Sequence, residues 1–133
     1  MRAVTVPERR RLPLVDRETL DRLQDHLDHP TAVRSFVLEF VQAWDERYLR
    51  LSTDIEQRNS VSALDAILSI KTTSTMVGAV RLAQLASGVE DLIRVDEFSA
   101  AAELLPRLNS CALETTEELL LGGEAASDEE TPG

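Results

Sequence analysis

The sequence predicts an all-α protein, an up-down four-helix bundle with a short additional helix ahead of it. Apolar residues recur three and four positions apart through four long segments, which is the period of an amphipathic helix. The connections between these segments are short, and short connections favour antiparallel neighbours. Alanine, leucine and charged residues are abundant, whereas aromatic residues make up only 4% of the chain, and this composition also favours helix.

The composition limits the size of the fold and the kinds of partner. A chain of 133 residues is long enough for one domain with a real core. Its formal net charge of −10 argues against nucleic acid and anionic membrane surfaces, because both need a basic patch. The sequence contains no apolar run of membrane-spanning length and no visible signal peptide. The single cysteine, Cys111, fits a reducing cytoplasm, so we expect a cytoplasmic protein. Thirteen arginines against one lysine are typical of a GC-rich bacterial genome.

The two ends of the chain differ from the middle. Residues 1–13 contain four arginines, two prolines and no helical period, which predicts a flexible basic arm. Gly122-Gly123 is expected to end the last helix, because glycine is the usual residue just past a helix C-terminus. The acidic residues 124–133 then predict a disordered tail. The bundle itself is expected over residues 14–123.

The first two helices differ in length and in aromatic content. A short helix is predicted over residues 17–28, capped by Asp16, ended by Pro30 and lying across one end of the bundle. A long helix is predicted over residues 31–57 and carries nearly all of the aromatic side chains. We interpret its apolar stripe as core packing and expect no cofactor. The stripe consists of Val33, Phe36, Val37, Phe40, Val41, Trp44, Tyr48, Leu51 and Ile55.

Three further helices are predicted over residues 61–77, 79–94 and 97–121. Ser60 or Ser62 is expected to cap the first of them, and Asp96 the last. Their core stripes are expected to contain Ala63, Ile67, Ile70, Ser74 and Val77; then Val80, Leu82, Leu85, Val89 and Leu92; and finally Phe98, Ala102, Leu105, Leu108, Ala112, Thr115 and Leu119.

The face of the helix over 61–77 that points away from the core has an unusual composition. At about 100° per residue, Leu68 and Thr72 project opposite the core stripe. A leucine near the solvent side of an amphipathic helix is unexpected. The run of small hydroxylated residues from 72 to 75 is also a poor choice for a helix interior. Both features make sense if another helix or another protein approaches this face closely.

These residues resemble the histidine phosphotransfer (HPt) family of bacterial phosphorelays. The family signature reads His-x-x-Lys-Gly, two small residues, a later Gly and a Leu-rich helix ending in Glu. This chain has Lys71, the small pair Thr73-Ser74, Gly78 and the helix Arg81–Glu90, and the resemblance extends from Pro13 to Leu121. It implies an HPt-like four-helix bundle and, as partner, a response-regulator receiver or histidine-kinase domain.

Two positions depart from the family signature. The slot of the phosphorylated His holds Leu68, and the Gly slot after the lysine holds Thr72. A neutral imidazole can accept and return a phosphoryl group, whereas an alkyl side chain can do neither. The resemblance therefore implies a degenerate member of the family, an adaptor or competitor that binds a two-component signalling partner without accepting phosphate. We expect a monomer whose docking residues are Leu64, Asp65, Leu68, Lys71, Thr72 and Thr75.

Two other functions remain open on the sequence. The chain could be a helical protein-interaction or self-association module unrelated to phosphorelay, or an active transfer protein with a non-standard acceptor. The sequence contains no Ser-His-acid set, Cys-His pair or phosphate-binding Gly-rich loop, so we expect no enzyme. His26 and His29 lack further ligands at zinc-like spacing, so we expect no metal site and interpret them as surface or capping residues. Four hydroxyls are conceivable acceptors for a separate kinase, those of Ser69, Thr72, Thr73 and Thr75.

Overall fold

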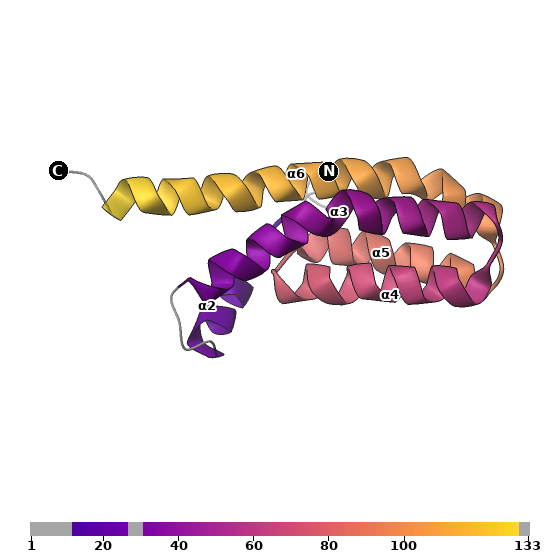
Figure 1. Cartoon of the computed structure of the whole chain (residues 1–133), viewed down its shortest axis with the longest axis horizontal. Helices are drawn as coiled ribbons and strands as arrows, with labels where there is room; N and C mark the ends of the chain where they lie inside the picture. Colours follow the sequence, from indigo (N-terminus) through magenta and orange to yellow (C-terminus); the bar gives the residue numbers. More distant parts are fainter. Residues whose placement is uncertain (1–11, 27–30, 131–133) are drawn as a thin grey trace, which may run out of the picture.

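The computed structural model describes residues 12–26 and 31–130, and the side chains as far as Leu121. The described residues form helices and no strand, which confirms the predicted all-α class (Figure 1). The helices are α2 (Arg17–His26), α3 (Ala32–Glu56), α4 (Ser60–Met76), α5 (Val80–Arg94) and α6 (Phe98–Glu130).

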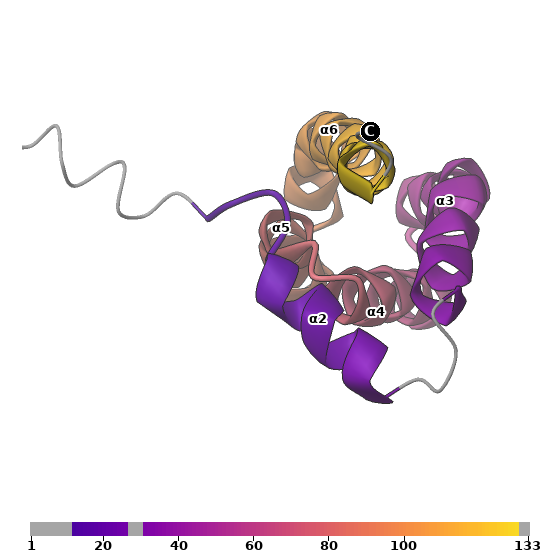
Figure 2. The same cartoon turned by 90° about the vertical axis from the view of Figure 1, so that its left-hand side faces the viewer.

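Helices α3 to α6 form an up-down four-helix bundle. Seen end-on, they occupy four corners, and each packs against the two helices beside it (Figure 2). Helix α2 lies across one end of the bundle, where it contacts α3 and α4 (Figure 2). This arrangement confirms the predicted bundle with its additional helix. None of the described helices is both long and apolar enough to cross a bilayer.

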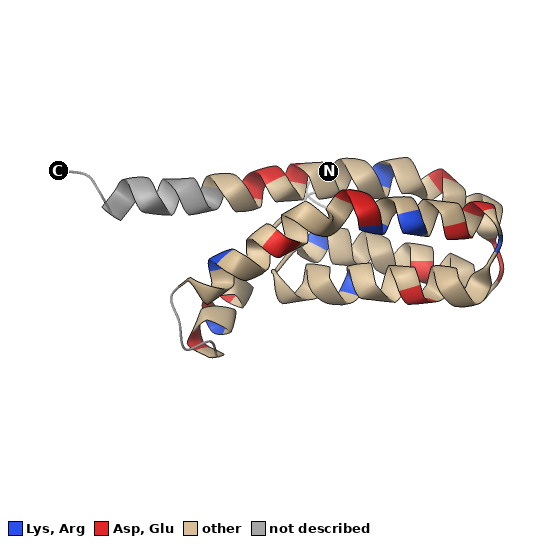
Figure 3. Ribbon diagram, viewed as in Figure 1, with Lys and Arg blue, Asp and Glu red and all other residues tan. Residues whose placement is uncertain are grey.

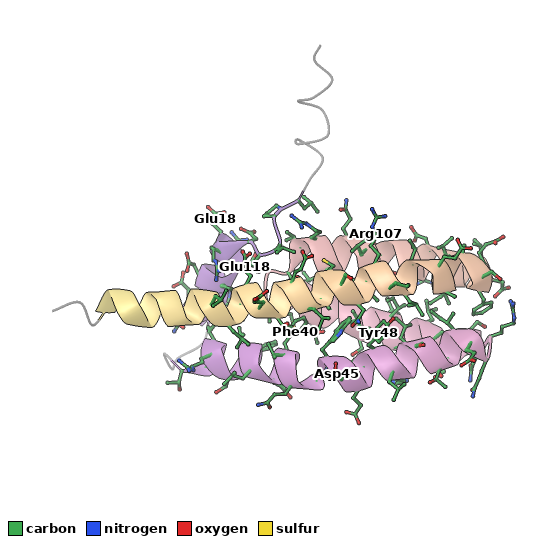
Figure 4. The ribbon with its side chains drawn as sticks, turned by 90° about the horizontal axis from the view of Figure 1, so that it is seen from above. Glu18, Phe40, Asp45, Tyr48, Arg107 and Glu118 are labelled. Atoms are coloured by element: carbon green, nitrogen blue, oxygen red, sulfur yellow. The ribbon has the colours of Figure 1, made fainter. Side chains whose placement is uncertain are left out.

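The core is formed by all four helices of the bundle. Trp44 is only 2% exposed, and its indole Nε1–H donates to Asn109 Oδ1 at 2.8 Å. Phe40 and Tyr48 point from α3 towards α6, whereas Asp45 points away (Figure 4). Every residue of the core stripe predicted on α4 is buried.

The stripe predicted on α6 is wrong at Ala102, and the stripe predicted on α5 packs against the core less deeply than expected. On α6, Ala101 is buried in place of Ala102, which is exposed. Apart from Cys111, the buried residues of this helix follow a regular alternation of three and four from Phe98 to Leu119, as in a bundle seam. On α5, Leu85 and Leu92 are half-buried, as is Val80, because the buried arc is rotated towards Ala86 and Ile93.

Each of the three turns in the bundle contains a residue with positive φ: Arg58 (56°), Gly78 (78°) and Asp96 (60°). In each turn, the backbone N–H of this residue and that of the residue after it donate to carbonyls of the preceding helix, as in a Schellman motif. Asp96 therefore ends α5 and does not cap α6. At α4, the cap is Asn59, whose Oδ1 accepts from the Ser62 backbone N–H at 3.2 Å. The predicted caps at Ser60, Ser62 and Asp96 are therefore wrong. Asn59 stands at the N-cap of α4, and Asp96 belongs to the turn that ends α5.

The ends of the bundle differ in part from the prediction. Helix α6 continues through Gly122-Gly123 to Glu130 and extends past the bundle (Figure 1), so the predicted helix end at 121 is wrong. The disordered acidic tail over 124–133 stays a prediction. Two glycines weaken a helix by roughly 1 kcal/mol each, which need not end one that is already nucleated. Residues 1–11 and 131–133 lie outside the described residues, as do 27–30 with His29. The arm over 1–13 and the boundaries of the bundle stay predictions.

Candidate functional site

The surface of α4 that points away from the core carries the predicted docking residues. We call the six of them, Leu64, Asp65, Leu68, Lys71, Thr72 and Thr75, the α4 face. Asp65 and Lys71 are the only charged residues of α4, which makes this helix the least charged of the four in the bundle (Figure 3). Helix α3 lies on one side of the α4 face and α5 on the other.

The apolar residues of the α4 face are less exposed than the sequence predicts. Asp65, Thr72 and Thr75 are exposed, but Leu64 and Leu68 are half-buried. Leu64 packs against the core cluster, because its position on α4 turns it towards α5. The most exposed apolar residue of α4 is Val61, at 81%. Val61, Leu64 and Ile93 line a cavity of about 350 Å³ beside the α4 face, together with Ser60, Arg94 and Asp96.

On the α5 side of the α4 face, Lys71 is held in an ion pair. Its Nζ lies 2.8 Å from Glu90 Oε1, and Arg94 Nη2 lies 2.8 Å from Glu90 Oε2. Glu90 is only 7% exposed, and hydrogen bonds from Lys71 and then from Arg94 lower the pKa of its carboxyl group. The sequence analysis did not assign Glu90 a role, although its position within the buried arc of α5 could have indicated one.

Glu90→Gln should destabilise the protein by about 1–3 kcal/mol near neutral pH, because two cations lose their shared carboxylate. Since the folded pKa of Glu90 is lowered from 4.5, its contribution is complete above about pH 4.5 and is lost as the pH falls through the folded pKa. Urea unfolding of both proteins between about pH 7 and 3 should show the difference shrinking in acid. Asp91→Asn, at an exposed neighbouring position, is the control. A difference that stays constant down to pH 3 would contradict the role assigned to the Glu90 carboxylate.

On the α3 side of the α4 face, two arginines cross to α4 one turn apart. Arg50 Nη2 lies 2.8 Å from Asp65 Oδ2, in a pair that is largely exposed. Arg47 Nη1 donates to Ser69 Oγ at 2.7 Å. The sequence analysis did not identify Arg47, because nothing in the period of one helix indicates which side chain it meets on the next.

The small hydroxylated residues of α4 make local bonds. Thr73 Oγ1 donates to the Ser69 carbonyl at 2.9 Å, and Thr75 Oγ1 donates to the Lys71 carbonyl at 2.8 Å. Such bonds to the preceding turn are a structural use of Ser and Thr inside helices. Ser69 Oγ is an acceptor from Arg47. In the part of the chain that the structure describes, no His, Asp or Glu side chain is hydrogen-bonded to the hydroxyl of Ser69, Thr73 or Thr75. These hydroxyls therefore have no general base beside them.

The remaining candidates lie away from the α4 face. His26 is exposed at the end of α2, with Nδ1 2.8 Å from the Arg22 carbonyl. No three His, Cys, Asp or Glu side chains of the described residues come together as they would around a metal ion. A cavity of about 440 Å³ lies between α5 and α6, lined by Leu12, Arg81, Gln84, Leu85, Arg107, Ser110, Cys111 and Glu114. Burial raises the pKa of the Cys111 thiol.

Comparison with known proteins identifies the fold. No family model matches the sequence, and no curated protein matches it. Among solved structures, the chain is similar to histidine-containing phosphotransfer protein B (HptB) from Pseudomonas aeruginosa PAO1, with 22% identity and a TM-score of 0.74. The match covers 86% of this chain and 96% of that protein. The chain therefore has an HPt-like helical-bundle fold.

Proposed function

We propose that this protein is a degenerate HPt-like domain that binds a receiver or histidine-kinase domain through the α4 face without accepting a phosphoryl group. It would act as an adaptor or competitor in a bacterial two-component pathway, as a cytoplasmic monomer and without enzymatic activity. One observation carries the proposal. Counted back three residues from Lys71 in the family signature that the sequence resembles, the slot of the phosphoacceptor His holds Leu68, which lies on the α4 face.

The chemistry around Leu68 supports binding without transfer. The alkyl side chain has no atom that can be phosphorylated. Lys71, which in the family signature would offer its charge to the phosphoryl group, is 2.8 Å from Glu90, so its charge is already offset. The exposed hydroxyl of Thr72 would need a base to become a nucleophile, and among the described residues neither histidine nor free carboxylate is hydrogen-bonded to it.

The composition of the surface supports a retained contact with another protein. Val61 is largely exposed, Leu64 and Leu68 are half-buried, and a cavity adjoins them on the α5 side. Covering the exposed apolar area of such side chains contributes favourably to a complex, against the entropy that association costs. The small side chains of Thr72 and Thr75 let a partner approach the helix closely. Apolar anchors surrounded by small and charged residues are typical of a docking surface.

Leu68→Glu should abolish binding to the partner, because it buries a charge at the centre of the contact. The measurement is calorimetry of the purified protein against a panel of receiver and histidine-kinase domains. We expect at least one to bind the wild-type protein and a loss of affinity of more than about tenfold in the variant. Because Leu68 is half-buried, Val61→Glu at the exposed end of the same surface serves as a second variant, and it should weaken binding with little change in melting temperature.

The control for added charge is Leu113→Glu on α6, where the leucine is 53% exposed and away from the α4 face. It should leave binding unchanged. If neither a receiver nor a kinase domain binds the wild-type protein, or if Leu68→Glu and Val61→Glu bind as tightly as wild type, the proposal is wrong. Incubation with a phosphorylated receiver should leave no acid-labile phosphate on the protein. Its appearance would instead support an active transfer protein with another acceptor.

A further inference from the structure

Arg47 differs from the other cations that border the α4 face. Arg50 is paired with Asp65, and both Lys71 and Arg94 are paired with Glu90. No carboxylate of the described residues lies within ion-pair distance of Arg47. The positive charge at the α3 side of this surface is therefore not offset.

The guanidinium of Arg47 is held in one orientation. The residue is half-buried, and its Nη1 on α3 donates to Ser69 Oγ on α4 at 2.7 Å. Its Nε is buried and has no acceptor. Its Nη2 is not among the buried atoms, and the described residues give it no acceptor. Nη2 of this permanently charged group is therefore the atom left to donate a charge-assisted hydrogen bond to a carboxylate of a partner.

We propose that Arg47 is a specificity-determining residue, which binds an acidic side chain of the protein that docks on the α4 face. This inference rests on the proposed function, since it concerns the partner of the same surface. The net charge of −10 repels acidic proteins in general. A single oriented cation at the α3 side of the α4 face would therefore select partners that place a carboxylate at this position, and Ser69 is its positioning residue.

The test uses the unphosphorylated receiver or kinase domain that binds the wild-type protein most tightly. Arg47→Gln should raise the Kd about tenfold, because a charge-assisted contact is lost. It should also flatten the dependence of Kd on NaCl between about 50 and 300 mM, since screening acts on the charge that has been removed. The matched control is Arg34→Gln, which removes the same charge from an exposed position of the same helix, on a different side. It should change neither the Kd nor its salt dependence.

Two further variants separate the charge from its orientation. Ser69→Ala keeps the charge but removes the hydrogen bond, and should weaken binding less than Arg47→Gln while keeping the salt dependence. Arg47→Lys should recover part of the affinity, because lysine keeps the charge without the planar fork. Melting temperatures establish that all variants are folded.

The outcomes distinguish this inference from the proposed function. If Leu68→Glu abolishes binding but Arg47→Gln behaves like Arg34→Gln, the docking surface stands and the role of Arg47 is wrong. If Arg47→Gln weakens binding with the expected salt effect while Leu68→Glu does not, the carboxylate contact stands and the centre of the docking surface lies elsewhere. If neither kind of domain binds the wild-type protein, both proposals fail.

Discussion

Trp44→Ala should lower the free energy of unfolding by about 3–5 kcal/mol, enough to unfold a marginally stable domain at physiological temperature. The side chain is almost completely buried between α3 and α6, stacks on Tyr48 at 5.9 Å between ring centroids, and donates to Asn109. The substitution leaves a cavity and an unpaired amide oxygen, and both destabilise the folded state. Urea unfolding followed by circular dichroism measures the change, because the protein is helical.

Two controls separate the causes of this loss. Trp44→Phe keeps most of the volume but removes the N–H donor, so it should cost about 1–2 kcal/mol. Leu49→Ala, at a leucine of the same helix that is 66% exposed, should change stability by less than about 0.5 kcal/mol. If Leu49→Ala destabilised the protein as much as Trp44→Ala, the orientation of α3 described above would be wrong.

Gly78→Ala should destabilise the protein by about 2–4 kcal/mol. Gly78 has a φ of 78°, and a Cβ atom there would lie 2.6 Å from the Asp16 carbonyl oxygen. The close approach is needed because the Asp16 backbone N–H donates to the Gly78 carbonyl at 2.7 Å, which attaches the start of α2 to the α4–α5 turn. A side chain would therefore strain the turn and push this segment away from the bundle.

Gly88→Ala is the matched control for Gly78→Ala. Gly88 lies inside α5, and a Cβ there would meet only the Leu104 side chain, at 4.0 Å. Because alanine favours helix over glycine, this change should stabilise the protein by about 0.5–1 kcal/mol. Thermal unfolding of the two variants should therefore shift in opposite directions. Equal shifts for both would show that the contact between Asp16 and Gly78 does not restrict this position.

The sequence predicted the helices well because their apolar residues repeat with the helical period, which depends only on the local geometry of the backbone. The sequence was less reliable where two neighbouring residues are equally apolar, as with Ala101 and Ala102. The helical period alone did not indicate which of the two alanines is buried. The sequence also failed at the turns, where Arg58 and Asp96 adopt a positive φ that only the hydrogen bonds of the preceding helices require. Helix α6 continues through Gly122-Gly123 because the long helix before these residues is already formed. The two glycines by themselves indicate a helix end.

The candidate site divides in the same way. The sequence by itself determined that position 68 holds an alkyl side chain and that Leu68 and Thr72 lie opposite the core residues of α4, because both follow from residue identity and the helical period. Only the tertiary structure decided that Lys71 is paired with Glu90, that Arg47 crosses to Ser69, and that Leu68 is half-buried. The period of a helix gives the direction of each of its side chains. Which residue they meet, and how far neighbouring side chains cover them, depends on how α3 and α5 pack against α4.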